Sequence, residues 1–144
     1  MSTAFDALLD AFEAALAATP VICSNILTDD PDPLSVDDTE AIVVSLGVSD
    51  PQQLGQLQGN PVDWATEVHV KCLAAANATS ARPAAHTLMK SAYARLAADP
   101  SLGIDGVFIG EPAISRESDR AATRTYAVTL TYNVQHRTVG LTLA

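Results

Sequence analysis

Two long segments alternate between apolar and polar residues, and this period of two constrains the fold more than any other feature. In residues 123–136 one set of alternate positions includes Thr125, Thr129, Thr131 and Asn133, and the other includes Tyr126, Val128, Leu130, Tyr132 and Val134. In residues 63–74 one set of alternate positions consists of Trp64, Thr66, Val68, Val70 and Cys72. Because side chains alternate between the two faces of a strand, each segment predicts a long strand with one face in a core.

Two other segments place apolar residues three and four positions apart, the spacing of a helix with one buried face. The first covers residues 4–18, with Thr3 or Ser2 available to cap its start. Its stripe consists of Phe5, Leu8, Leu9, Phe12 and Leu16. The second begins after a cap at Ser80 and ends at Asp99-Pro100, and its stripe consists of Leu88, Met89, Ala92, Tyr93 and Leu96.

Shorter apolar runs predict three more strands, over residues 21–26, 41–47 and 107–114. Polar segments between them predict long loops over residues 28–39 and 48–62, and a charged hairpin connection over residues 115–122. This order predicts an α+β fold, in which two helices pack on one face of a mainly antiparallel sheet of about four to five strands. The length of 144 residues fits a single domain, 1–144.

Charge is divided along the chain, which has a net charge of −9. Residues 1–70 contain 12 acidic residues and no Lys or Arg, whereas residues 71–144 contain eight basic residues and five acidic ones. The division argues against a nucleic-acid-binding domain, which needs a concentrated basic face. It fits either a well-solvated acidic surface or contact with copies of itself and partner proteins through complementary patches.

No arrangement typical of a catalytic or metal site is present in the sequence. His69, His86 and His136 fall in three different predicted elements without cysteine or carboxylate at ligand spacing, and we expect His69 and His136 on strand surfaces. The aspartates of the first loop lack the glycine and distal glutamate of a calcium loop. A P-loop, a GxGxxG motif and a nucleophile elbow are also absent. We therefore expect a protein that is not an enzyme and needs no metal or cofactor.

The two cysteines, the hydropathy and the N-terminal segment predict whether the chain forms redox or metal pairs, spans a membrane or is exported. Cys23 and Cys72 lack the spacing of a metal knuckle or a redox pair, so we expect buried thiols. No segment approaches the ~20 apolar residues of a membrane-spanning helix. The N-terminal segment carries acids where a signal peptide has a basic start, so we expect no export.

Several segments, taken together and in order, resemble one known family. They include the helix FDALLDAFEAAL, the strand AIVVSLG, and Trp64 followed by an alternating strand. They also include Arg-Leu before Asp-Pro-x-Leu-Gly at 95–103, the short strand GVFIGEP, and the ending Tyr-x-Val-x-His-Arg-Thr at 132–138. The combination resembles the tail terminator (minor tail protein U-like) family of long-tailed bacteriophages, and the resemblance covers most of the chain.

The resemblance implies a structural subunit of a virion. Such subunits form a hexameric ring on the head-proximal end of the tail tube, stop tube polymerisation and offer a docking face to the head. The implied partners are other copies of the chain, the tail tube protein and a head-completion or connector protein. DNA would pass through the ring without specific binding, and no membrane is involved. The implied location is the head-proximal end of the tail, after assembly in the host cytoplasm.

Within this interpretation, the candidate interaction surface consists of loop acids and of arginines around the last hairpin: Asp29, Asp30, Asp32, Asp37, Asp38, Arg116, Arg120 and Arg124. We expect the acidic loops 28–40 or 48–62 to face the lumen, where they would repel phosphates, or a tail or head partner. We expect the arginines to meet acids of a neighbouring subunit.

Three alternatives remain open from the sequence. The first is another neck or tail-completion protein of a phage-like particle, because fold does not fix position in the particle. The second is a small homo-oligomeric enzyme or ligand-binding domain, which requires a pocket with convergent polar groups. The third is a monomeric adaptor, which would show a single mass at every concentration.

Overall fold

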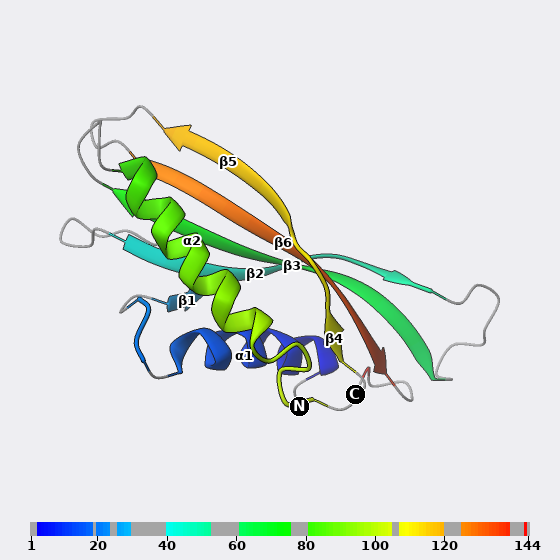
Figure 1. The fold of residues 1–144 in the computed structure, drawn as a ribbon. Helices are drawn as coiled ribbons and strands as arrows, with labels where there is room; N and C mark the ends of the chain where they lie inside the picture. The colour runs from blue at the N-terminus through cyan, green and yellow to red at the C-terminus, as the bar shows by residue number, and fades with distance from the viewer. Residues whose placement is uncertain are drawn as a thin grey trace.

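The computed structural model describes residues 3–18, 20–23, 26–29, 40–52, 61–75, 81–104, 107–119, 125–138 and 143. Within these residues, two helices cover one face of a six-stranded, mostly antiparallel sheet (Figure 1). The elements are α1 (Ala4–Ala17), β1 (Ile26–Thr28), β2 (Glu40–Pro51), β3 (Val62–Ala75), α2 (Ala81–Ala97), β4 (Phe108–Ile109), β5 (Ala113–Asp119) and β6 (Thr125–Thr138). The predicted α+β class is confirmed, with slightly more strands than expected.

The two alternating segments form the centre of the sheet. β3 and β6 pair antiparallel along their whole length, from Val62 opposite Thr138 to Ala75 opposite Thr125. β2 pairs with the other side of β3, and the short β1 continues this edge by parallel pairing with β2. β4 and β5 both pair with the outer side of β6. The sheet therefore runs from β1 at one edge to β5 at the other (Figure 1).

The helical stripes bury the face of the sheet that the alternation predicts to be apolar. α1 contributes Leu8, Phe12 and Leu16, and the Phe12 ring lies 5.8 Å from the Tyr132 ring between centroids. The predicted stripe of α2 packs in the same core, where Leu88, Ala92 and Leu96 are fully enclosed. The backbone of α1 lies closest to β1 and β2, whereas that of α2 lies closest to β3 and β6. The aromatic side chains of α1 also reach β6, so α1 is not confined to one half of the sheet.

Polar contacts fix both ends of α1. At its start Thr3 and Asp6 form a capping box, because the Asp6 N–H donates to Thr3 Oγ1 and the Thr3 N–H donates to Asp6 Oδ2. At its end Arg95 of α2 donates to the carbonyl oxygens of Ala15, Ala18 and Pro20. A positively charged guanidinium is stabilised by the free carbonyl oxygens at the C-terminal end of a helix, and the Arg95 guanidinium links α2 to α1 in this way.

Several predicted boundaries are wrong. In the predicted strand 21–26, residues 21–23 are not in a strand, Val21 is 69% exposed, and β1 starts only at Ile26, where β2 offers a pairing partner. Residues 48–51, predicted as loop, continue β2 beyond a bulge between Leu46 and Ser49. Residues 115–119, predicted as a hairpin connection, belong to β5 at the edge of the sheet. There the side chains from Ala113 to Glu117 are exposed, so a polar composition is compatible with a strand.

Candidate functional site: a subunit with an acidic and a basic side

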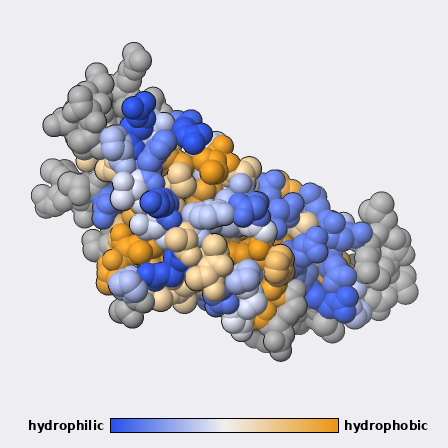
Figure 2. Space-filling view, in the orientation of Figure 1, coloured by the Kyte–Doolittle hydropathy of each residue, from blue (hydrophilic) through white to orange (hydrophobic). Residues whose placement is uncertain are grey.

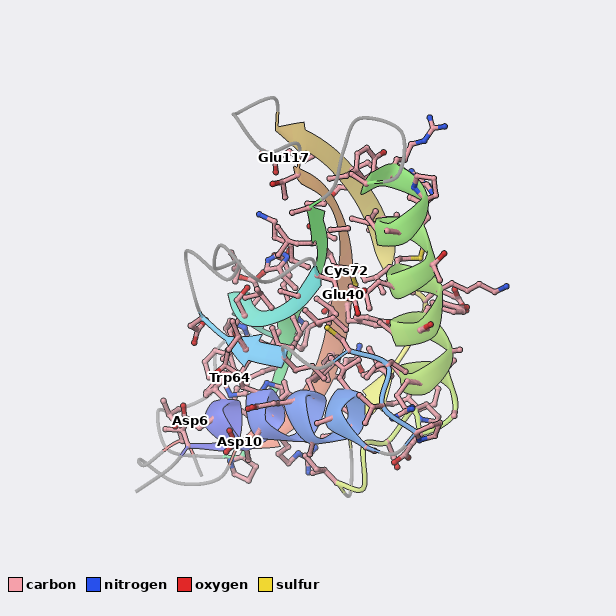
Figure 3. The ribbon with its side chains drawn as sticks, turned by 90° about the vertical axis from the view of Figure 1, so that its left-hand side faces the viewer. Asp6, Asp10, Glu40, Trp64, Cys72 and Glu117 are labelled. Atoms are coloured by element: carbon pink, nitrogen blue, oxygen red, sulfur yellow. The ribbon has the colours of Figure 1, made fainter. Side chains whose placement is uncertain are left out.

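The first half of the chain builds an acidic side. α1 carries Asp6, Asp10 and Glu13 and contains no Lys or Arg. Figure 3 shows Asp6 and Asp10 on this helix, and Asp10 is exposed. The hydrogen bonds from Thr3 hold the pKa of Asp6 below its ordinary value, so Asp6 stays ionised in the capping box. The exposed Asp29 lies directly after β1, at the sheet edge near which α1 packs.

The second half of the chain builds a side rich in exposed basic residues. α2 carries Arg82, Lys90 and Arg95 and contains no Asp or Glu. Arg82 and Lys90 are exposed, whereas Arg95 is turned to the end of α1. Figure 2 shows hydrophilic residues over the part of the surface where α2 begins. α1 thus carries three acidic residues and α2 three basic ones, and both helices lie on the same face of the sheet.

The edge strand β5 adds one more basic residue to the side of α2. Arg116 is exposed and pairs with Val128, a residue of the buried face, so Arg116 lies on the helical face of the sheet. Glu117, opposite Ala127, lies on the other face. Within the part of the chain that the structure describes, the outer edge of β5 has no strand partner. An open edge of this kind is available for contact with another chain.

The strand order determines where the acidic first half and the basic second half of the chain lie in the fold. In space the strands lie in the order β1, β2, β3 and β6, and both β4 and β5 pair with the outer side of β6, although they precede it in sequence. The backbone of α1 lies closest to β1 and β2, although Phe5 near its start reaches His136 of β6, and α2 lies over β3 and β6 (Figure 1). Residues 1–70, which lack Lys and Arg, supply the whole of the first edge. The acidic side, formed by α1 and the β1 edge, and the basic side, formed by α2 and Arg116 of β5, are thus two separate groups of residues on one subunit.

Two of the eight predicted interaction residues are described. Asp29 lies at the β1 edge with a φ of 53°, and its N–H donates to the carbonyl of Val44 at 3.0 Å. Arg116 lies at the β5 edge, on the opposite side of the sheet. The structure does not bring these two residues together within one subunit. The other six lie outside the described residues: Asp30, Asp32, Asp37, Asp38, Arg120 and Arg124.

The prediction for His136 is wrong, because its side chain is buried with only 5% exposed. His136 Nε2 lies 2.6 Å from Thr66 Oγ1, which in turn lies 2.9 Å from Ser49 Oγ, so one hydrogen-bonded chain crosses β6, β3 and β2. The ring of Phe5 covers it, with centroids 5.0 Å apart. The sequence does contain a signal for this burial: His136 lies two residues after Val134, and alternate residues of a strand share a face.

This hydroxyl–imidazole chain does not form a catalytic triad. A triad needs an orienting acceptor at the second ring nitrogen, and among the described residues His136 Nδ1 has no hydrogen-bond partner. The described residues also contain no group of three potential metal ligands. Cys23 and Cys72 are buried as predicted, and burial raises the pKa of the Cys72 thiol to about 12. The absence of enzyme activity stays a prediction.

The buried imidazole predicts a pH dependence of stability. Burial lowers the pKa of His136 below its ordinary value of 6.5, so between these two values the unfolded chain binds more protons than the folded one. The stability that the neutral imidazole of His136 contributes is fully present above pH 6.5 and is lost as the pH falls through the folded-state pKa. Urea unfolding at pH 7.5 and 5.0 measures this loss. Between these two pH values the free energy of unfolding should fall more for the native chain than for His136→Gln. The His69→Gln control should behave like the native chain, and equal losses in all three would contradict this origin.

Comparisons with known proteins do not assign the chain to a family. No family model matches it, and no curated protein matches it either. The structure itself defines an α+β domain with a charge-divided helical layer. In the described residues, no helix is long and apolar enough to span a membrane.

Proposed function

We propose that this chain is a structural ring subunit that caps the head-proximal end of a phage tail tube. The observation that carries the proposal is that one subunit offers an acidic side, on α1 and the β1 edge, and a basic side, on α2 and β5. Because each copy offers one side of each charge, the acidic side of one copy meets the basic side of the next. Head-to-tail contacts of this kind form a ring when the rotation between copies closes.

The position on a tail tube is supported by the sequence resemblance. The segments that resemble tail terminators lie in the elements that build the sheet and its helical cover: α1, β2, β3, the end of α2, β4 and β6. The ring occupies the last layer of the tube, prevents the addition of further tube protein and presents its free face to the head. The acidic residues that dominate the net charge limit adhesion of DNA phosphates during passage.

Tube assembly in the presence and absence of the chain tests the capping function. With the tube protein and its length-determining partner alone, tubes are expected to grow beyond a uniform length. Addition of the chain before polymerisation should give uniform, capped tubes, as measured by electron microscopy. The same length distribution with and without the chain would contradict the proposed function.

A further inference from the structure

A small pocket lies beside the C-terminal half of α2, on the side of the sheet edge formed by β4. Its volume is about 260 Å³, and it is lined by both polar and apolar groups of α2, β4 and β6. The side chains that matter are those of Tyr93, Phe108, Glu111 and Tyr132. This volume lies just below the ~300–1,000 Å³ of pockets that hold whole drug-sized ligands, so the pocket suits a smaller group such as a side-chain head group.

Three polar groups, the hydroxyls of Tyr93 and Tyr132 and the carboxylate of Glu111, line the pocket. The Tyr93 hydroxyl donates to the Glu111 carboxylate, at 2.8 Å from Oε1 and 2.9 Å from Oε2. Tyr132 is only 2% exposed, and its hydroxyl has no hydrogen-bond partner among the described residues. A buried hydroxyl without a hydrogen-bond partner is unfavourable, so a ligand atom that hydrogen-bonds to it recovers part of that cost.

The electrostatics of the pocket select for positive charge. Glu111 is the charged residue of the lining, and no Lys or Arg lines the pocket. The hydrogen bond to Glu111 raises the pKa of Tyr93, and burial together with nearby negative charge raises the pKa of Tyr132. Three aromatic residues, Tyr93, Phe108 and Tyr132, line the pocket together with Glu111, and ring faces attract cations. Phe108, at the edge strand, is 67% exposed and available to cover a bound group.

We propose that this pocket binds the guanidinium or ammonium head of a basic side chain that is presented by a partner protein. The head group donates to the Glu111 carboxylate and to the Tyr132 hydroxyl oxygen, and Phe108 packs over its aliphatic stem. In the proposed ring, a neighbouring copy meets this edge with its acidic side, and residues 1–70 contain no Lys or Arg. We therefore assign the basic side chain to a different protein, an assignment that rests on the proposed function. The binding chemistry itself does not depend on ring formation.

Titration with methylguanidinium, followed by NMR of the isotope-labelled chain, tests the pocket. We expect saturable shifts at the pocket residues, and no binding of propionate, an anion of similar size. Glu111→Gln keeps the size of the side chain and should weaken binding at least tenfold, whereas the Glu117→Gln control on β5 should leave it unchanged. Equal binding of propionate, or equal effects of the two glutamine variants, would overturn the proposal.

The Tyr132 hydroxyl has a test of its own. Tyr132→Phe removes only an atom without a partner, so the free energy of unfolding should not fall, while methylguanidinium binding should weaken several-fold. Unchanged binding in this variant would remove the hydroxyl from the site.

The source of the side chain is tested with N-acetylarginine amide in sedimentation experiments. The mass of the self-assembled chain should stay constant, and dissociation would show that a second copy occupies the pocket.

Discussion

Reversal of the two exposed charges on α2, Arg82→Glu with Lys90→Glu, is expected to leave the chain monomeric at low ionic strength. In the proposed ring these residues face Asp10 and Glu13 of the next copy, and like charges placed across an interface cost several kcal/mol. Each 1.4 kcal/mol is tenfold in affinity, so association should weaken ~100-fold or more. Sedimentation velocity at low and high salt measures the effect, because screening also weakens the native contact.

A mixing experiment separates this contact from a general effect of net charge. The variant Asp10→Lys with Glu13→Lys should also be monomeric alone, but a mixture of the two reversed variants should assemble with alternating copies. Lys90→Glu should impair association more than Lys71→Glu, which makes the same charge change on the opposite face of the sheet. Unaltered mass in the α2 variant, or a mixture that stays monomeric, would exclude the helix–helix contact.

Replacement of Phe12 by alanine is expected to destabilise the fold by about 3–5 kcal/mol, because a large ring leaves a cavity in a packed core. The Phe12 side chain is fully buried, and it joins α1 to Tyr132 at the centre of the sheet. The same change loosens α1, which carries much of the acidic side. Self-association should therefore weaken even under conditions in which most of the chain is folded.

Urea denaturation of Phe12→Ala measures the loss, and Phe12→Leu provides the matched control. Leucine refills most of the volume, so the control should lose markedly less stability and keep self-association. A loss below about 1 kcal/mol for Phe12→Ala would mean that the site collapses around the smaller side chain. It would also contradict the role of Phe12 as the main anchor of α1.

The long elements of the fold were predictable because their patterns repeat over many residues. The alternation in β3 and β6 and the stripes of α1 and α2 each extend over three turns or five strand positions, and tertiary packing follows them. Edge segments were not predictable in this way. The end of β2 and residues 115–119 of β5 have a polar sequence, and only pairing with β3 and β6 makes them strands. Residues 107–114, predicted as one strand, are instead divided between β4 and the start of β5.

The candidate site was predictable only in part. The charge division is visible in sequence, but its placement on α1 and the β1 edge and on α2 and β5 depends on the order of strands in the sheet. Glu111 is one of several acids in sequence, and only the approach of the segment after β4 to Tyr93 distinguishes it. Tyr132 has the pattern of a core residue, so its unsatisfied hydroxyl is visible only in three dimensions.

The central claim, a ring at the head-proximal end of a tail tube, is tested most directly by locating the chain on isolated tails. A gold label on the chain, viewed by electron microscopy after assembly with tube protein, should mark one end of each tube, the end that joins the head. Labels along the tube, at the distal tip, or only on unassembled protein would contradict the claim.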